Sequence, residues 1–562
     1  MHWFAGFLMK YPELAVFLAI GLGHLIGNVR FGGFSFGPVT GSLLAGLAIG
    51  QIAEVQISSM VKSFLFLLFL FGIGYSVGPQ FLQALRQSGV KPLLLALVCA
   101  GTGLGTVVVV ARVLGLDAGF SAGLLSGGLT QSPAMGTATE AIGALGLPDV
   151  DRDRLVAHVA IADAICYVFG AVGAIWFCSV LAPRLLNVDL KVESLALEES
   201  LGVRRNAPGV QSGYRTFELR AYETPPDARI VGMSVADAEQ RFPDARMFLL
   251  RLRRHGEIRE VAPDLVIKAG DVLAIGGRRR PLIEILGPHA AEVDDPELLD
   301  APILTVETLV IDAGLSGTAL RAIADMPWAR GIYLEFLQRG TQFLPLAPDL
   351  VVQRGDILKL HGPQETVERG VTHIGPVIAP ATATDFIVLG FGVFLGGLAG
   401  ALLHFDLAGT EVVIGPSVGA LVAGLLVGHL RTRYPLFGRI PDGAVALMTS
   451  LGLAAFVAMT GLHAGPVFVS ALKEAGFGLL LGGAVVTMMP LFVGLAFGHW
   501  VLRMNPVLLL GALAGALTMT AAMAAVQAKA DSPVAVLGYT PAYPLGQILL
   551  TLWGSVIVIL MA

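Results

Sequence analysis

Two long apolar segments on either side of a charged middle segment constrain the fold of this chain more than any other feature. Residues 191–380 hold 49 of the chain's 79 charged residues. The remaining residues are far less charged than the roughly 25% typical of soluble domains. With 14% charged and 55% hydrophobic residues overall, the chain cannot cover its surface with polar groups. The distribution predicts a soluble middle domain between two membrane halves and excludes a purely soluble protein.

Each apolar half contains stretches long enough to cross a bilayer, which takes about 20 mostly apolar residues. Each half also has one apolar stretch crowded with glycine, serine and threonine, at 119–147 and at 507–530. We expect these two stretches to enter the membrane as re-entrant hairpins without crossing it. The five spans expected in each half lie near 12–30, 36–53, 60–78, 92–115 and 155–183, and near 384–403, 412–430, 444–463, 475–500 and 540–561.

The charges of the short loops predict the orientation in the membrane, because cytoplasmic loops are enriched in lysine and arginine. The loops expected on the side of the middle domain are mainly basic, and those on the opposite side are mainly acidic. The middle domain is therefore expected in the cytoplasm, with both termini outside. That arrangement requires an odd number of crossings in each half, which five spans satisfy.

The two halves are repeats of each other. FGPVTGSLLAGLAIG at 36–50 matches IGPSVGALVAGLLVG at 414–428, and LSGGLTQSPAM at 125–135 matches LAGALTMTAAM at 513–523. Two further matches, GIGYSVGPQFLQAL with MTGLHAGPVFVSAL and YVFG with YPLG, follow in the same order. With an odd number of spans, the repeats have inverted topology. This is the signature of a secondary transporter with its substrate site between the repeats near the membrane midplane.

The two polar stretches carry the clearest sign of a binding site. A proline or a cluster of small polar residues breaks a membrane helix, and the freed backbone groups must be satisfied by protein or line a water-filled cavity. The helix ends and hydroxyl groups created by such a break favour a carboxylate. The alternative is that these small residues only allow tight helix packing. The residues expected to line the substrate site are Thr130, Gln131, Ser132, Pro133, Thr518, Met519 and Thr520.

Four further residues within the apolar halves are candidates for function. Ionisable residues inside a membrane are functional candidates by default. Asp163 could bind a cation or proton, or orient the first hairpin, and an interior structural partner is an equal alternative. Tyr167 and Tyr543 are expected to pack or bond behind the hairpins. His463 could contact substrate, although an interfacial histidine without a ligand is the commoner outcome.

The middle segment contains a second, independent repeat. APDLVIKAGDVLAIGG at 262–277 matches APDLVVQRGDILKLHG at 347–362, with alternating β-rich runs and a short helix-like segment in each copy. Glycine followed by aspartate fits a turn before a buried strand. We expect two small α+β units at 215–295 and 296–375, preceded by a linker at 186–214. A basic run such as Arg278–Arg280 usually lies on a solvent-exposed surface, and it could also contact the head groups of anionic lipids.

The PDLxxxxGDxLxxxG pattern, present twice, resembles the RCK C-terminal domain, a regulatory ligand-binding module of potassium transport systems. Two such domains between two repeat halves, together with GGLTQSP at 127–133 and GPxxGxLxAG at 37–46 and 415–424, resemble the aspartate–alanine exchanger family of bacterial transporters. The usual Thr-Pro of the second hairpin is Thr520-Ala521 here, which puts that helix break in doubt. The resemblance implies exchange of small amino acids or dicarboxylates across the bacterial inner membrane by a homodimer. It also implies an elevator-like movement and a small regulatory ligand at the cytoplasmic domains.

Other classes of function have less support from the sequence. An ion channel, or an ion-coupled transporter gated by ligand binding to the RCK-like domains, is the principal alternative. An enzyme is not expected, because no metal or nucleophile spacing and no phosphate-binding loop occurs. No cofactor or metal site is expected, since Cys99, Cys166 and Cys178 are scattered in apolar runs. A net charge of −5 gives no sign of a nucleic-acid partner.

Overall fold

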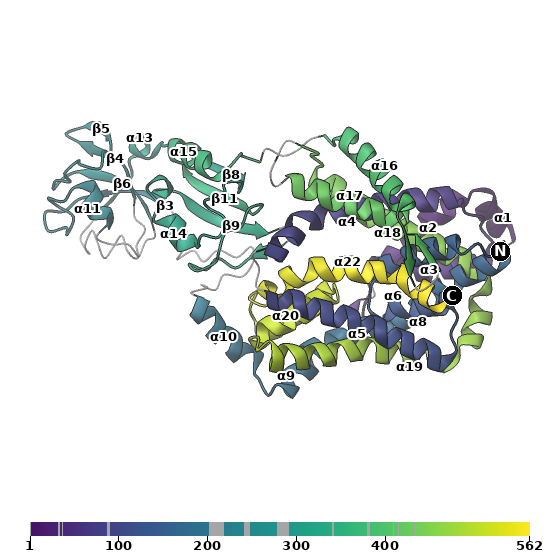
Figure 1. Ribbon diagram of the computed structural model, residues 1–562. Helices are drawn as coiled ribbons and strands as arrows, with labels where there is room; N and C mark the ends of the chain where they lie inside the picture. Colours follow the sequence, from purple (N-terminus) through teal and green to yellow (C-terminus); the bar gives the residue numbers. More distant parts are fainter. Residues whose placement is uncertain are drawn as a thin grey trace. The chain divides into compact units, whose positions relative to one another are not determined.

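Tertiary contacts divide the chain into two compact units. The helical unit contains Met1–Ser200, Gln338–Pro345 and Pro380–Ala562, and the central unit contains Leu201–Leu337 and Leu346–Ala379 (Figure 1). The computed structural model describes residues 2–31, 34–35, 37–86, 90–201, 218–240, 248–277, 291–339, 342–378, 383–407, 410–413, 415–431, 434 and 437–562.

The two apolar halves fold into the same order of elements. In each half a strand pair follows the first long helix, and a pair of short helices precedes the last long one. The first half consists of α1 (His2–Lys10), α2 (Pro12–Asn28), β1 (Arg30–Phe31), β2 (Phe34–Ser35), α3 (Gly37–Ile52), α4 (Ser59–Arg86), α5 (Val90–Leu114), α6 (Ala118–Gly128), α7 (Pro133–Ala144), α8 (Asp149–Trp176), η1 (Phe177–Leu181), α9 (Ala182–Leu185) and α10 (Leu190–Leu201). The second half consists of α16 (Phe386–Leu402), β12 (His404–Leu407), β13 (Thr410–Val413), α17 (Pro416–Arg431), α18 (Asp442–Ala464), η4 (Gly465–Val467), α19 (Phe468–Ala496), η5 (Phe497–Val501), α20 (Pro506–Ala516), α21 (Thr520–Ala530) and α22 (Val536–Met561).

Six of these helices are long and apolar enough to cross a membrane, three in each half among the described residues. A seventh span results if Trp3–Lys10 and Pro12–Asn28, bent by 108°, form one span. The spans expected near 36–53, 384–403 and 412–430 are helices of 16, 17 and 16 residues. A 16-residue helix is about 24 Å long, shorter than the roughly 30 Å hydrocarbon core. Five crossings per half therefore stays a prediction.

Glycines at helical spacing explain why α6 and α20 pack so closely against the last long helix of each half. A Cβ at Gly123 would lie 2.3 Å from the carbonyl oxygen of Val159, and one at Gly511 would lie 2.0 Å from that of Ala535. The backbones touch because small residues allow close helix approach in membranes. The pairs α6–α8 and α20–α22 are among the most extensive helix contacts of the chain.

Within the helical unit the long helices form two groups. One contains α2, α3, α4, α16, α17 and α18, in which α17 packs on α4 and α18 packs on α3. The other contains α5–α8 and α19–α22, in which α19 packs on α5 and α8 and α22 packs on α5 and α7. We call these groups the scaffold group and the hairpin group. Each pairs elements from both halves of the sequence in matching places, as expected for a repeat.

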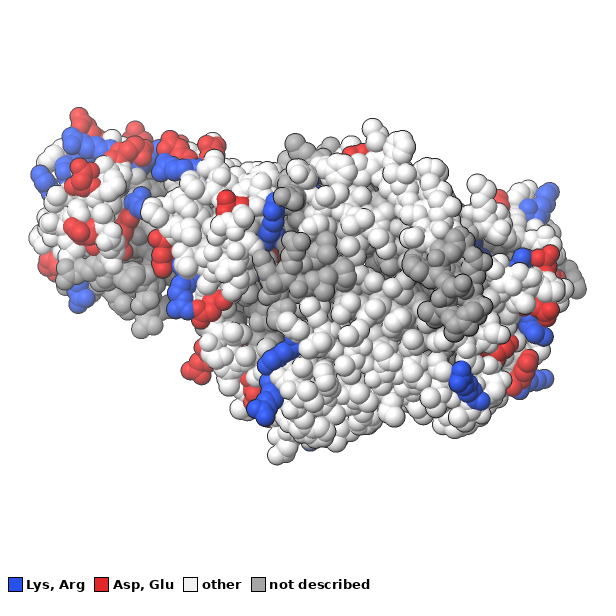
Figure 2. All heavy atoms as spheres, viewed as in Figure 1, with Lys and Arg blue, Asp and Glu red and all other residues white. Residues whose placement is uncertain are grey.

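The charged side chains lie where the sequence pattern predicts them. Figure 2 shows lysine, arginine, aspartate and glutamate gathered over the central unit and at the two ends of the helical unit. Between those ends, the visible face of the helical unit presents a broad surface almost without charge. A surface of this kind suits a hydrocarbon environment, because a charged side chain in the bilayer centre is costly.

Between residues 218 and 363 the chain forms two sheets, an antiparallel one with strand order β5-β4-β6-β3-β7 and a second with order β10-β9-β11-β8. The sequence offset of 85 is kept in β3 and β8, in β4 and β9, and in β6 and β11. The elements are β3 (Glu218–Glu223), α11 (Val235–Gln240), β4 (Phe248–Arg254), β5 (Glu257–Glu260), β6 (Val272–Gly277), β7 (Glu292–Val293), α13 (Pro296–Leu299), β8 (Ile303–Leu309), α14 (Leu320–Ala324), η3 (Pro327–Ala329), β9 (Tyr333–Arg339), β10 (Gln342–Leu344), β11 (Ile357–Pro363) and α15 (Gln364–Ile374).

The Gly-Asp pairs of the central unit form the same turn in both copies. Gly270 and Gly355 have φ angles of 83° and 90°, which glycine adopts without a steric penalty. The Asp271 carboxylate accepts the Lys268 N–H at 2.8 Å, and the Asp356 carboxylate accepts the Gln353 N–H at the same distance. The predicted turns are thus present. The domain limits and the RCK resemblance stay predictions, and Arg278–Arg280 lies outside the described residues.

Candidate substrate site

The first predicted helix break lies between α6 and α7. Thr130 has a φ of 55°, in the left-handed region. The Gln131 N–H donates to the Ser126 carbonyl at 2.7 Å, and the Thr130 N–H donates to that of Gly127 at 3.1 Å. This pair of bonds ends a helix whose next residue is left-handed, usually glycine. A threonine there costs about 1–2 kcal/mol, and such strained positions cluster at ligand sites.

The second break, between α20 and α21, has the same geometry without a proline. Thr518 has a φ of 56°. The Met519 N–H donates to the Ala514 carbonyl at 2.8 Å, and the Thr518 N–H donates to that of Gly515 at 2.9 Å. The doubt raised by Ala521 in place of proline is therefore removed. The left-handed threonine, rather than a proline, ends the helix in both halves.

The two breaks meet at Gln131. The Thr518 hydroxyl donates to Gln131 Oε1 at 2.7 Å, and Gln131 Nε2 donates to the Thr551 hydroxyl on α22 at 2.9 Å. The Gln131 side chain is only 2% exposed. Residues 387 positions apart are thus joined directly, and Gln131 holds the two tips together with its own amide.

Hydroxyl groups with free hydrogen-bonding capacity lie beside this junction. Ser132 is 6% exposed, stands at the N-cap of α7, and makes no side-chain hydrogen bond to the described residues. Thr130 and Thr518 are half-buried, and Met519 is 7% exposed. Met519 gives the N-terminus of α21 no side-chain cap. An uncapped helix N-terminus beside serine and threonine hydroxyls attracts an anionic group.

Two tyrosines of α22 lie behind the second break. The Thr520 hydroxyl is 3.1 Å from the Tyr539 hydroxyl, and the Tyr539 ring stacks on that of Tyr543 with 5.3 Å between centroids. Tyr543 therefore contacts the partner of Thr520, and its predicted role behind the hairpin stays a prediction. Tyr539 was missed. The repeat could have found it, because it stands one helical turn before Tyr543, as Asp163 stands before Tyr167.

Asp163 and Tyr167 lie beside the first break. The Ser126 hydroxyl donates to Asp163 Oδ1 at 2.6 Å, and Asp163 is 1% exposed. A Cβ at Gly170, three residues after Tyr167, would lie 3.1 Å from Thr130 Cγ2. The structure therefore places this turn of α8 directly against the left-handed threonine.

His463 is the one predicted residue whose described contacts lead elsewhere. It lies near the C-terminal end of α18, in the scaffold group, and interacts electrostatically with Lys62 and Asp153. No described hydrogen bond or ring contact joins it to either break. Its part in substrate binding stays a prediction.

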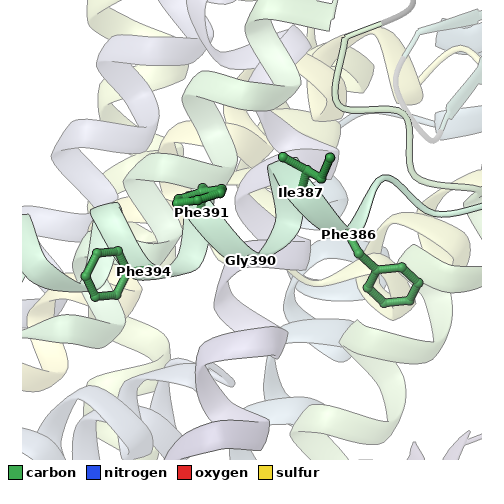
Figure 3. Close-up of a pocket in the computed structure, with 5 residues that line it drawn as sticks. All are labelled: Phe386, Ile387, Gly390, Phe391 and Phe394. Atoms are coloured by element: carbon green, nitrogen blue, oxygen red, sulfur yellow. The ribbon is translucent and has the colours of Figure 1, made fainter.

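A surface hollow on α16 has no chemistry suited to a polar substrate. Figure 3 shows its lining side chains, Phe386, Ile387, Phe391 and Phe394, with Gly390 between them, all from one helix. Each of these four side chains is more than 60% exposed. An apolar helix face of this kind suits acyl chains of the bilayer, so we place the substrate site at the breaks.

The described residues also contain no group of three or more histidine, cysteine, aspartate or glutamate side chains that could hold a metal ion. Cys99, Cys166 and Cys178 are buried and free. The chemistry at the breaks is therefore that of hydroxyl, amide and backbone groups together with Asp163.

Comparisons with known proteins agree with this architecture. The family described as a predicted permease membrane region, that of the aspartate–alanine exchangers, matches residues 15–183 and 386–559. An uncharacterized transporter of Bradyrhizobium diazoefficiens is 52% identical over 92% of this chain and 100% of its own length. An uncharacterized transporter of Shewanella oneidensis is 36% identical over 100% of both chains. No solved structure matches. The chain belongs to the aspartate–alanine exchanger family of bacterial membrane transporters.

Proposed function

We propose that this protein is an antiporter that exchanges aspartate, alanine or related dicarboxylates across the bacterial inner membrane. The observation that carries the proposal is the meeting of the two broken helices at Gln131 and Thr518. Broken helices from two repeats that meet inside the membrane form the substrate site of many secondary transporters. The substrate carboxylate would accept hydrogen bonds from Thr130 and Ser132, and Thr518, Thr520, Met519 and the tyrosines would line the site around it.

The chemistry of this junction supports a carboxylate more than a cation. Hydroxyl donors and the start of α21 point to negative charge, and Gln131 keeps the donors in place. Pro133 and Ala134 begin α7 directly after Ser132, so the serine hydroxyl is held at a helix start. We propose Gln131 as a positioning residue, because its amide is already occupied by Thr518 and Thr551.

We propose an elevator-like movement of the hairpin group against the scaffold group, in repeats of inverted topology. The surface between the groups supports this, because apolar and small side chains slide more readily than interlocked polar ones. The Phe66 ring of α4 lies against Gly136 of α7, where a Cβ would meet it. A polar contact also crosses the surface: the Ser417 N–H donates to the Glu140 carboxylate at 3.3 Å.

We further propose that the central unit is cytoplasmic, that both termini are outside, and that the protein is a homodimer. The loop charges support this orientation. The central unit is proposed as a regulatory module that binds a small ligand, as the resemblance to the RCK C-terminal domain implies. A thermal-shift screen of the full-length protein against nucleotides and inorganic ions tests that role, with a ligand-dependent shift expected.

Counterflow in liposomes tests the exchange. Purified protein is reconstituted with unlabelled aspartate inside, and uptake of labelled aspartate or alanine is followed. We expect rapid uptake that depends on the internal substrate. Absence of counterflow with aspartate, alanine and a panel of dicarboxylates would overturn the proposal. Electrical recording on the same liposomes detects the alternative, because a channel conducts ions without any internal substrate.

Single substitutions test the site itself. A lost hydrogen bond to a charged group is worth about 1.5–3 kcal/mol, so Ser132→Ala is expected to weaken substrate binding about tenfold or more. Ser470→Ala is the matched control, because the Ser470 hydroxyl is exposed and bonds only the Val467 carbonyl in its own turn. If both variants transport like the unmodified protein, Ser132 does not contact substrate.

A further inference from the structure

The carboxyl group of Asp163 lies in the hairpin group, and none of the cationic side chains that the structure describes is paired with it. It is 1% exposed in the middle of α8, and its Oδ1 accepts the Ser126 hydroxyl of α6 at 2.6 Å. Ser126 is fully buried, and its Oγ also lies 3.2 Å from the Gly123 carbonyl oxygen. Among the described residues, Ser126 is the hydrogen-bonding partner of this carboxyl group.

The helices packed against α8 bring no cation to Asp163. On α8 itself the titratable neighbours are Cys166 and Tyr167. His158, five residues earlier, is bonded to Asp117 at 2.6 Å. Helices α3 and α6 carry no charged residue. The charged or titratable residues of the remaining packed helices are Glu140 on α7, bonded to Ser417, and Asp442, His463, Lys473, Glu474 and Lys529, near the ends of α18, α19 and α21.

A carboxylate in such a place is costly in its ionised form. The penalty for burying an unpaired ion is several kcal/mol, and ionisable residues within membranes mark ion or proton paths. A bound metal cation would need several more oxygen ligands, and one serine hydroxyl does not supply them. A proton on the second carboxyl oxygen removes the charge with no further ligand.

We propose that Asp163 is the proton-binding site of the transport cycle, so that exchange of the carboxylate substrate is coupled to proton movement. This inference rests on the proposed transport function. The carboxylate takes a proton from hydronium on one side of the membrane, which forms an O–H bond on Oδ2. The same bond breaks when the proton passes to water on the other side. In the conformation described here the carboxyl group is closed to solvent, so each proton transfer requires the hairpin group to move.

Ser126 connects this proton site to the substrate site. Its hydroxyl binds Asp163, and its carbonyl accepts the Gln131 N–H that shapes the first break. Gln131 in turn accepts the Thr518 hydroxyl of the second break. Three consecutive hydrogen bonds therefore link the protonation state of Asp163 to both helix tips.

The second half offers no equivalent acid, which sets the stoichiometry. The carbonyl of Asp163 lies against Gly127, and that of Tyr539 lies in the same way against Gly515. Tyr539 bonds Thr520 with a neutral hydroxyl. Each chain thus has one such proton site, in its first half only, among the described residues.

Infrared difference spectroscopy tests proton occupancy without any substrate. The spectrum of the full-length protein minus that of Asp163→Asn at pH 7 is expected to show the carbonyl stretch of a carboxylic acid. A pair of carboxylate bands with no acid band would overturn the proposal. If the asparagine variant does not fold, Asp163→Glu replaces it, and a shift of the acid band is expected. An acid band at the same position in Asp163→Glu and in the unmodified protein at pH 7 would also overturn the proposal.

A pH gradient across liposomes tests the coupling. With one net proton moved per exchange cycle, a gradient of one pH unit shifts the exchange equilibrium at most about tenfold. We expect acid-outside gradients to increase uptake of labelled aspartate in the unmodified protein, and this stimulation to be lost in Asp163→Asn. Asp149→Asn, an exposed member of an ion pair with Arg152, is the control and should keep it. Gradient stimulation that survives in Asp163→Asn would overturn the proposal.

The two arms separate the possible failures. If the unmodified protein shows no counterflow with any carboxylate, the exchange function fails, and the infrared band still decides whether Asp163 holds a proton. If counterflow is present but insensitive to the gradient, only the coupling fails. Asp163 would then be a structural partner of Ser126 between α6 and α8.

Discussion

The hydrogen bond between Thr518 and Gln131 joins the two halves at their most constrained point, and a double-mutant cycle measures its strength. Gln131→Met keeps the length of the side chain and removes its amide. Thr518→Val keeps the β-branched shape, so that the left-handed backbone strain at φ 56° is the same in both forms. Each substitution therefore removes the hydrogen bond with little change in packing.

The expected magnitudes follow from the bonds that are lost. Gln131→Met removes the 2.7 Å bond from Thr518 and the 2.9 Å bond to Thr551. The contact to the Gln547 carbonyl, at 3.5 Å, is at the limit for a hydrogen bond. Interhelical bonds in membranes average about 0.6 kcal/mol and reach about 1.7 kcal/mol. We expect Gln131→Met to lower the free energy of unfolding by about 1–3 kcal/mol.

The cycle is measured by unfolding in mixed detergent micelles with increasing sodium dodecyl sulfate. The coupling energy between Gln131→Met and Thr518→Val is expected to be about 0.6–1.7 kcal/mol. Thr106→Val is the control, because the Thr106 hydroxyl bonds only the Thr102 carbonyl of its own helix, and its effect should add to that of Gln131→Met. A coupling energy below about 0.3 kcal/mol, the usual error of additivity, would refute a stabilising hydrogen bond between the two breaks.

Three further predictions concern the central unit, the α6–α8 contact and the surface between the groups. Burial by itself would raise the pKa of Asp271, but hydrogen bonds from Arg254 and the Lys268 N–H hold that pKa below its ordinary value of 3.8. The ionised Asp271 therefore stabilises the folded protein above pH 3.8, and this stabilisation is lost as the pH falls through the lower pKa of Asp271 in the folded state. The thermal unfolding temperature of full-length Asp271→Asn should not show this decrease at acid pH. Gly127→Ala would place a Cβ 2.6 Å from the Asp163 carbonyl and should cost about 1–3 kcal/mol in detergent unfolding, whereas Gly101→Ala, with open space around it, should cost nothing. Glu140→Ala removes the acceptor of the Ser417 N–H, worth about 1 kcal/mol; labelling of a cysteine introduced at Ser417 should rise, and unchanged labelling would contradict this contact.

Local sequence patterns predicted much of the candidate site because helix breaks leave a local signature. The small polar residues around Thr130 and Thr518 identified both breaks, and the repeat placed them at matching positions. Proline is not required for the break, since Thr518 adopts the same left-handed geometry as Thr130 although Ala521 stands at the position of Pro133 in the matched motif. The sequence does not show that a threonine will adopt the left-handed backbone conformation.

The partners of these residues could not be predicted, because they lie far away in sequence. Ser126 and Thr551 look like ordinary small residues of apolar helices, and only packing brings them to Asp163 and Gln131. The repeat aligns Tyr539 with Asp163 and could have identified it, but no sequence motif includes Tyr539. The spans expected near 36–53 and 412–430 are the helices Gly37–Ile52 and Pro416–Arg431, and the sequence alone did not decide whether helices of 16 residues cross the membrane.

The sequence by itself determined the class of this protein: two repeated apolar halves, a charged central insert with its own repeat, and a break in one helix of each half. These features follow from composition and from local backbone chemistry, which act over a few residues. The tertiary structure decided that the two breaks meet and that Gln131 is bonded to both. It also decided that, among the described residues, Asp163 has one hydroxyl partner and no cationic one. Such facts depend on contacts between residues up to about 400 positions apart, and helix packing alone determines them.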